Sequence, residues 1–208
     1  MVARDLLLRE AGFQAAFLTA AGVAARMGTA QVAAHQVGYQ LWTLIALLLD
    51  SFAIAAQSLV GAALGGGDAN TARHTALRVA RYGLVAGTAT GAVLAAGWAL
   101  IPGIFTSSGP VVHQTRLLWP FLAGMQPAAG VLFALDGVLI GAGDVGFMRT
   151  LTLVAALAVF VPVNLAALHW HWGIAGVWAG LTGFIVARLI GMVWRTLGTR
   201  WMVTGGSR

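Results

Sequence analysis

Two stretches of sequence decide how this chain folds: Gly-Ala-Ala-Leu-Gly-Gly-Gly-Asp at residues 61–68 and Gly-Val-Leu-Ile-Gly-Ala-Gly-Asp at residues 137–144. We call them the first and second glycine motifs. Two glycines four residues apart leave a flat patch on one helix face, where a second helix can approach closely. The later glycines suit a left-handed helix end, and the aspartate can cap the helix that follows. We therefore expect two helices that end at the same kind of boundary.

The composition around the two glycine motifs is that of a membrane protein. Hydrophobic residues make up 59% of the 208 residues and charged residues only 9%. A soluble domain of this size would not tolerate that balance on its surface. At roughly 20 apolar residues for each crossing of a bilayer, about six spans fit. The sequence predicts an all-α integral membrane protein, residues 1–208, whose six transmembrane helices form a single lobe.

The expected spans follow from the apolar runs and the turns between them. They cover about residues 6–27, 32–66, 82–102, 115–141, 150–168 and 174–195. The second run is far longer than a bilayer requires, so we expect its helix to be tilted or to project beyond the lipid. Residues 69–81 carry three arginines on one face. We expect this amphipathic segment to lie at the cytoplasmic membrane surface.

Glycines and prolines add detail to two of the spans. Gly83, Gly87 and Gly91 recur at four-residue spacing in the third span, which predicts a face for close helix packing. Pro120 and Pro127 lie inside the fourth span. Two prolines in one span predict a kinked or locally opened helix, because neighbouring groups in a membrane protein can satisfy the carbonyls that proline leaves free.

Arginine supplies all of the formal positive charge, since the chain has twelve arginines and no lysine against six acidic residues. With a cytoplasmic N-terminus and six alternating spans, every arginine except Arg26 and Arg116 falls on the inside, as the positive-inside rule requires. This predicts a multi-pass protein of the cell (inner or plasma) membrane with both termini cytoplasmic. The arginines are scattered among apolar runs, so we expect no nucleic acid partner.

A polar stripe with an acid at its centre runs along the second span. It consists of Gln36, Thr43, Asp50 and Gln57 at near-seven spacing, with Gln40 beside them. An ionised carboxylate costs a few kcal/mol inside a bilayer, and such residues are usually functional. The stripe predicts a face turned to a water-filled cavity or an ion path. The structural alternative is hydrogen bonding between helices, with Asp50 protonated or paired.

Two further polar residues lie in the fourth span. Asp136 is either a cavity acid or the partner of an arginine such as Arg149 or Arg188. Gln126 either lines the broken part of the span or donates a hydrogen bond to a carbonyl freed by the neighbouring proline. The candidate residues for the substrate cavity are therefore Gln36, Gln40, Asp50, Gln57, Gln126 and Asp136.

The sequence contains no motif that indicates catalysis or a cofactor. Cysteine is absent, which excludes disulfides and thiolate metal sites. His169 and His171 lie in an aromatic turn without a third ligand, so we interpret them as an interfacial feature and expect no metal. No phosphate-binding loop, dinucleotide fingerprint or nucleophile elbow is present. We expect a protein that is not an enzyme and holds no cofactor.

Three motifs, in order along the chain, resemble those of a known transporter family. They are Ala34-His35-Gln36-Val37 with Gln40-Leu41-Trp42, then Asp-Ser-Phe-Ala-Ile-Ala-Ala-Gln at 50–57, then Leu-Asp-Gly-Val-Leu-Ile-Gly-Ala-Gly-Asp at 135–144. Together they resemble the multidrug and toxic compound extrusion (MATE) transporters, in particular the DinF-like branch. The resemblance covers nearly the whole chain.

The resemblance implies a secondary transporter of two six-helix lobes, which exports organic cations or other amphiphiles in exchange for protons or sodium. This chain corresponds to the C-terminal lobe. The implied partners are a small amphiphilic or cationic substrate, the lipid bilayer, and either the missing N-terminal lobe or a second copy. The alternative is a self-contained half-size membrane module, which acts as a homodimer or as a non-transporting interaction subunit.

Overall fold

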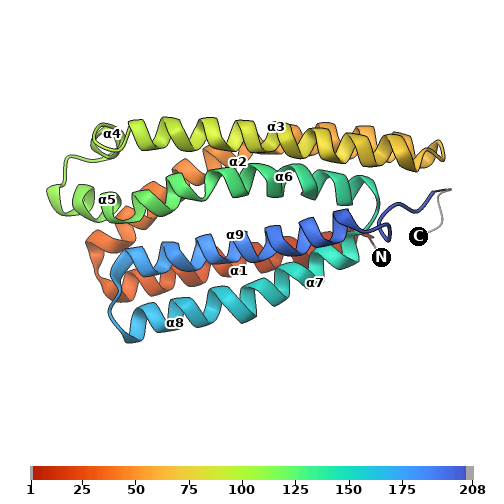
Figure 1. Ribbon diagram of the computed structural model, residues 1–208. Helices are drawn as coiled ribbons and strands as arrows, with labels where there is room; N and C mark the ends of the chain where they lie inside the picture. Colours follow the sequence, from red (N-terminus) through yellow and green to blue (C-terminus); the bar gives the residue numbers. More distant parts are fainter. Residues whose placement is uncertain (1, 205–208) are drawn as a thin grey trace.

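The computed structural model describes residues 2–204, which form a bundle of α-helices joined by short turns (Figure 1). The elements in chain order are α1 Val2–Met27, α2 Thr29–Gly65, α3 Ala69–Ala96, α4 Ile101–Phe105, α5 Gly109–Gly124, α6 Gln126–Gly141, α7 Val145–Ala155, the π-helical turn η1 Ala156–Phe160, α8 Val161–His169 and α9 Gly173–Leu197. The described residues contain no strand. The prediction of an all-α protein is confirmed.

Most of the described helices are long and apolar enough to cross a bilayer. Four segments meet this condition: α2, α3, the continuous run from α7 to α8, and α9. Helices α5 and α6 meet it as a pair bent by 50°. Helix α1 has 26 residues and lies along the others, but Asp5, Arg9 and Arg26 lower its hydropathy. The structure is that of a multi-pass membrane protein, and a sixth span formed by α1 stays a prediction.

Helix α2 is the longest element, with 37 residues. At 1.5 Å per residue it measures about 55 Å, against a hydrocarbon thickness of about 30 Å. It runs obliquely through the bundle, from a contact with α1 near its start to a contact with α3 near its end (Figure 1). The tilt lets one helix contribute to the packing of both sides of the bundle.

Residues 69–81 do not form a separate surface segment, contrary to the expectation from sequence. They are the first turns of α3, which continues without a break to Ala96. Asp68 caps this helix by accepting hydrogen bonds from the hydroxyl of Thr71 at 2.6 Å and from its backbone N–H at 2.9 Å. These bonds favour the carboxylate and hold the pKa of Asp68 below its ordinary value. The cap therefore starts α3 directly after the first glycine motif, well before the apolar turns.

Helix α3 packs on α6 through the glycine face that its sequence predicts. Gly83, Gly87 and Gly91 are all buried. A methyl group on Gly83 would collide with the backbone carbonyl of Gly130 in α6, and one on Gly130 would collide with the carbonyl of Gly83. The two backbones are thus in direct contact. Without glycine at these positions the helices would have to move apart.

The second glycine motif packs against α2 on another face of α6. A Cβ on Gly141 would lie 2.5 Å from the carbonyl oxygen of Gln57 in α2, and one on Gly61 would lie 3.4 Å from the carbonyl oxygen of Gly141. Gly137 faces the backbone of Ala53 at a distance that leaves no room for a methyl group. Helix α6 is therefore held between α2 and α3 by backbone contacts on both faces.

The ends of the two glycine motifs differ. Gly67 and Gly143 have φ angles of 81° and 72°, so both helices end in the left-handed conformation, as predicted. Asp68 then caps α3, but Asp144 makes no capping hydrogen bond. Its carboxylate instead accepts a hydrogen bond of 2.6 Å from Nε of Arg195 in α9. The prediction that both aspartates serve as caps holds only for the first motif.

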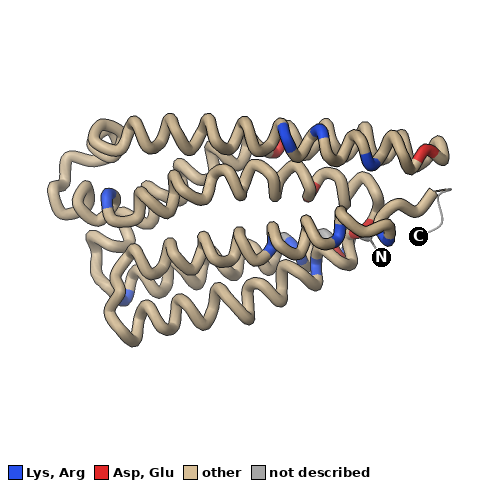
Figure 2. The backbone as a smooth tube through the Cα atoms, viewed as in Figure 1, with Lys and Arg blue, Asp and Glu red and all other residues tan. Residues whose placement is uncertain are grey.

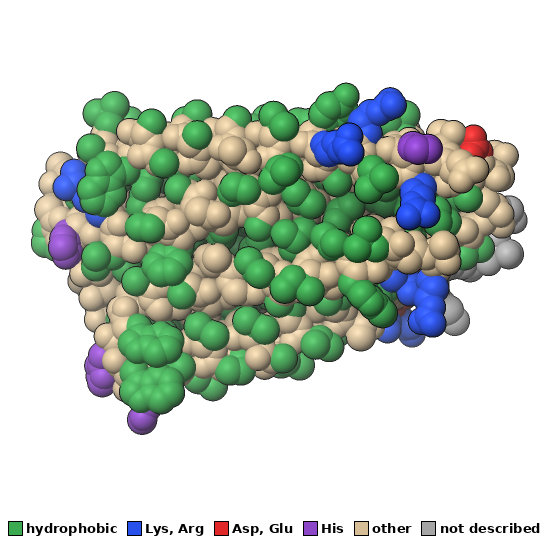
Figure 3. Space-filling model, in the orientation of Figure 1, with side chains coloured by type: hydrophobic (Ala, Val, Ile, Leu, Met, Phe, Trp, Pro, Cys, Tyr) green, Lys and Arg blue, Asp and Glu red, His purple; other side chains and the backbone are tan. Residues whose placement is uncertain are grey.

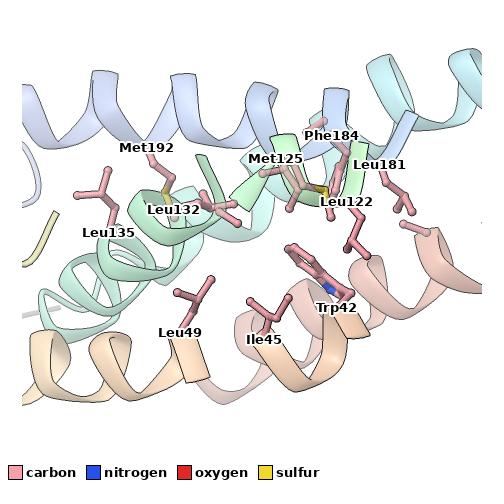
Figure 4. Close-up of a cluster of buried hydrophobic side chains, with 14 of the residues drawn as sticks. Trp42, Ile45, Leu49, Leu122, Met125, Leu132, Leu135, Leu181, Phe184 and Met192 are labelled. Atoms are coloured by element: carbon pink, nitrogen blue, oxygen red, sulfur yellow. The ribbon is translucent and has the colours of Figure 1, made fainter. Parts of the chain in front are cut away.

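Apolar side chains from α2, α5, α6 and α9 fill the space between the helices (Figure 4). Trp42 and Leu49 of α2 point toward Leu132 of α6, and Phe184 and Met192 approach from α9. The outside of the bundle is also largely apolar, as expected for lipid contact (Figure 3). Charged residues gather toward the end of the bundle where α1 begins and α9 ends (Figure 2). Which side of the membrane this end faces stays a prediction.

The close contact of α2 with α6 yields the first testable prediction. Gly137→Ala should lower the free energy of unfolding by about 1–3 kcal/mol, because the added methyl group forces the two backbones apart. Gly22→Ala in α1 is the matched control, since a Cβ at Gly22 has no atom within 4 Å. Thermal unfolding of both variants in the same detergent measures the difference. Equal stability of the two variants would contradict the proposed contact.

Candidate functional site

A cavity of about 310 Å³ opens between α1, α2 and α6. Five of its twelve lining residues are aromatic, and its polar groups include two carboxylates and one guanidinium. The lining residues are Arg9, Phe13, Gln14 and Phe17 from α1, Tyr39, Trp42, Thr43, Ala46, Leu47 and Asp50 from α2, and Phe133 and Asp136 from α6. Two of the predicted site residues, Asp50 and Asp136, thus line one cavity although 86 positions separate them in the sequence (136 − 50).

Asp136 is held by two arginines from two other helices. Nη2 of Arg188 in α9 lies 3.0 and 3.2 Å from the two carboxylate oxygens, and Nη2 of Arg9 in α1 lies 3.2 Å from one of them. Asp136 and Arg188 are buried, with 4% and 1% of their surface exposed. We call these three residues the Asp136 cluster. It ties α1, α6 and α9 together beside the cavity.

The ring of Phe13 fixes the positions of both arginines. The Arg188 guanidinium lies 4.4 Å from the ring centroid and that of Arg9 lies 5.7 Å from it. A cation over an aromatic face is attracted by the negative face of the ring, and more strongly where water is excluded. Phe13 in turn packs edge-on against Phe184, at a centroid distance of 5.3 Å. The guanidinium groups therefore have little freedom to leave the carboxylate.

The sequence left two roles open for Asp136, and the structure combines them. Asp136 lines the cavity and also pairs with Arg188, one of the two partners considered. The other, Arg149, instead binds Asp5 of α1 at 2.6 Å. The contribution of Arg9 was not predicted. Because two arginines surround the Asp136 carboxylate, its charge is matched within the protein, and we interpret it mainly as a positioning group.

Asp50 occupies a different position in the same cavity. Its residue is exposed in the bundle, on the α2 wall, in contrast to buried Asp136. Thr43 lies two turns earlier on the same wall, and its hydroxyl donates a hydrogen bond of 2.9 Å to the carbonyl of Tyr39. Asp50 is thus the carboxylate of the cavity that an entering solute can reach most directly.

The glutamines of the polar stripe do not all reach the main cavity. Gln36 lines a smaller cavity of about 110 Å³, which shares Gln14, Phe17 and Tyr39 with the larger one. Gln40 and Gln57 are exposed and line neither of these two cavities. Helix α2 is long and tilted, so the two ends of the polar stripe lie away from the main cavity. Residues seven positions apart on this helix therefore face different spaces.

Gln126 lies at the break between α5 and α6 and forms a hydrogen bond across it. It is fully buried, and its side-chain Nε2 donates a hydrogen bond of 2.8 Å to the carbonyl of Leu122. This matches the kind of bond that the sequence offered as the alternative to cavity lining. The bend of 50° occurs at this point, between Pro120 and Pro127, so the predicted kink of the fourth span is confirmed.

Ion pairs between helices recur at the charged end of the bundle. Asp5 and Arg149 join α1 to α7, and Asp144 and Arg195 join the turn after α6 to α9. Neither pair was predicted, although the sequence places all four charges near helix ends on the same side of the expected layout. Among the side chains that the structure describes, no three histidine, aspartate or glutamate residues come together as a metal site.

A bundle of long apolar helices around a cavity with ionisable groups is the architecture of a multi-pass membrane protein, in which such groups mark a candidate path for a substrate or an ion. The chain belongs to the MatE family, whose sequence profile it matches over residues 7–166. The family that the three motifs resemble is therefore confirmed.

Individual relatives agree with this assignment. The chain is 35% identical to Protein DETOXIFICATION 42 of Arabidopsis thaliana over 191 residues, which cover 91% of this chain and 36% of the relative. It is 30% identical to the probable multidrug resistance protein NorM of Xanthomonas axonopodis pv. citri over 178 residues, which cover 84% of this chain and 38% of that protein. The chain thus spans little more than a third of the length of these relatives.

The fold is also found in solved protein structures. It matches a multidrug resistance MATE family transporter of the MOP superfamily, solved in an outward-facing conformation, with a TM-score of 0.87 and 13% sequence identity. The match covers 99% of this chain and 46% of that structure. At this level of identity the likeness concerns the fold alone.

The Asp136 cluster yields the second prediction. Arg188→Gln should destabilise the protein by about 3–5 kcal/mol, because it removes the arginine that contacts both oxygens of a buried carboxylate. Arg149→Gln, at a pair whose arginine side chain is 28% exposed, should cost clearly less. Unfolding in detergent, followed for both variants, provides the comparison. A loss at Arg188 no larger than that at Arg149 would show that the Asp136 cluster does not hold the bundle together.

Proposed function

We propose that this chain forms one lobe, the C-terminal one, of a secondary antiporter that exports small amphiphilic or cationic compounds in exchange for protons or sodium. The family assignment supports a transport role, and the printed names of NorM and of the solved relative describe multidrug resistance. The DinF-like branch stays our assignment within the family, on the three sequence motifs.

The cavity between α1, α2 and α6 is the observation that carries this proposal. Its volume of about 310 Å³ lies in the range of small-molecule sites. The rings of Phe17, Tyr39, Trp42 and Phe133 offer apolar surface and aromatic faces that attract a cation. Asp50 adds a carboxylate on the same wall. This combination suits a ligand that is partly apolar and carries a positive charge.

In this mechanism the two acids of the cavity have different tasks. Asp50 binds either the cationic group of the substrate or the coupling ion, and competition between them for one carboxylate links import of the ion to export of the substrate. Asp136 stays with Arg9 and Arg188 and keeps the third wall of the cavity in place. Alternating access then requires movement between helices. The bend of 50° between α5 and α6, at Met125, is where we expect such movement.

The second half of the transport path comes from outside this chain. We propose a preceding six-helix lobe as that half. Two copies of this chain would be the alternative, since the chain spans only 36–46% of the relatives and solved structure described above. The end that carries most arginines is proposed to face the cytoplasm of the cell membrane, with both termini there.

The role of Asp50 yields the third prediction. Asp50→Asn should lower substrate efflux from cells about tenfold or more, because it removes a charge-assisted contact worth about 1.5–3 kcal/mol. Membrane insertion should be unchanged, since the residue is exposed in the bundle. Asp68→Asn is the matched control, as asparagine also caps helices well and Asp68 lies at the start of α3, outside the cavity.

Efflux of a fluorescent organic cation from cells that express equal amounts of each variant tests this role. Wild-type efflux by the Asp50→Asn variant of the complete transporter would remove Asp50 from the transport path. Equal losses in the Asp50 and Asp68 variants would point to a general folding defect.

A further inference from the structure

A crevice on the outer flank of the bundle lies apart from the proposed transport cavity. It has a volume of about 170 Å³ and opens between α3, α6 and α9 near the charged end. Its lining residues are Arg73, Ala76, Leu77 and Ala80 from α3, Val131 and Leu135 from α6, and Val193, Thr196 and Leu197 from α9. Apart from Arg73 and Thr196, the lining is entirely aliphatic.

The shape of the crevice follows from the helix packing. The small side chains Ala76 and Ala80 lie on the same face of α3, four residues apart, between α3 and its neighbours. The bulkier Leu77 and Val193 form its rims and are exposed, at 49% and 36%. The result is an apolar slot that runs along the helices from the charged end toward the middle of the bundle, on a surface that faces lipid.

A second hollow lies at the polar end of this slot. It is formed by Trp194, Arg195, Leu197, Gly198, Thr199 and Arg200 at the end of α9. Leu197 lines both spaces, so they adjoin. Trp194 is 65% exposed beside the hollow. Exposed tryptophan is typical of the level of lipid headgroups, so the hollow lies where the membrane interface is expected.

The charges around the two spaces are mainly positive. Arg73 is exposed at the mouth of the slot, and none of the ion pairs among the described residues involves it. Arg195 is already bound to Asp144 at 2.6 Å. Figure 3 shows arginine side chains over α3 and near the end of α9, with apolar side chains between them. A ligand at this position meets cations at one end and aliphatic groups at the other.

We propose that the slot and the adjoining hollow together bind one phospholipid with an anionic headgroup. One acyl chain lies in the slot against Ala76, Ala80 and Val131, and the phosphate lies between Arg73 and the end of α9. Basic pockets between transmembrane helices are suited to anionic headgroups, and an interfacial arginine attracts an anionic lipid by about 1 kcal/mol. The hydroxyl of Thr196 is the one uncharged polar group inside the slot; it donates a hydrogen bond of 2.9 Å to the carbonyl of Met192, so its oxygen can accept one from a hydroxyl of a glycerol headgroup.

This site is independent of the proposed transport function, because it shares no residue with the cavity that holds Asp50 and Asp136. A bound lipid would connect α3 to α9. Contacts between these two helices are otherwise made mainly through α6. The lipid would therefore stabilise the packing of the outer flank from the membrane side.

Native mass spectrometry of the full chain in a mild detergent tests the proposal and gives the fourth prediction. Phosphatidylglycerol should bind about fivefold more tightly than phosphatidylcholine of the same chain length, the ratio that corresponds to about 1 kcal/mol. Arg73→Gln should abolish this preference. Arg78→Gln removes the same charge from an exposed position of the same helix that does not line the slot, and it should leave the preference intact.

Two further arms distinguish the source of the phosphate and test the apolar slot. Glycerol phosphate, which has the headgroup chemistry without acyl chains, should not displace the bound phosphatidylglycerol. Ala80→Phe, which fills the slot, should lower binding of both lipids. Equal effects of Arg73→Gln and Arg78→Gln would overturn the proposal, because they would indicate general attraction to the surface. Displacement by glycerol phosphate would also overturn it and would assign the site to a free phosphate.

Discussion

The backbone contacts of α6 with α2 and α3 are the constraint on which the rest of the structure depends. Burial of apolar surface contributes little free energy to helix association inside a bilayer, because the lipid is itself apolar. Close van der Waals contact between backbones has to stabilise the association instead. Gly130 makes that contact with α3, and Gly137 and Gly141 make it with α2. Once α6 is held in this way, Phe133 and Asp136 on its remaining face are presented to the cavity. The glycine motifs thus determine where the ionisable groups lie.

Ion pairs between helices stabilise one end of the bundle, whereas the middle of the bundle contains a bend and a π-helical turn. The Asp136 cluster and the Asp144 and Arg195 pair connect α1, α6 and α9 toward the end where α9 finishes. Toward the middle, the chain bends at Met125 and passes through the π-helical turn before Pro162. The proposed transport function needs both properties, since the cavity must keep its shape while helices shift around it.

Much of this fold could be predicted from sequence because its determinants are local. Apolar runs predicted long membrane helices, and the spacing of Gly83, Gly87 and Gly91 predicted a packing face without naming its partner. The partners of Asp136 were harder, since Arg9 lies 127 positions away and only the packing of α1 against α6 and α9 brings it near. The single helix α3 was missed because charge suggested a surface segment, whereas the Asp68 cap begins one continuous helix. Gln40 and Gln57 line neither of the two cavities, since the tilt of α2 is not readable from periodicity, and their role in a substrate path stays a prediction.

The central claim is that the cavity between α1, α2 and α6 is the substrate path. The absence of cysteine makes a direct measurement possible. Thr43→Cys places a thiol in the cavity, and Ser107→Cys places one on an exposed position of the turn between α4 and α5 that does not line it. A membrane-impermeant maleimide should label both variants, and an exported organic cation should slow the labelling of Thr43→Cys while leaving that of Ser107→Cys unaffected. Labelling of Thr43→Cys that is insensitive to any exported cation would contradict the account.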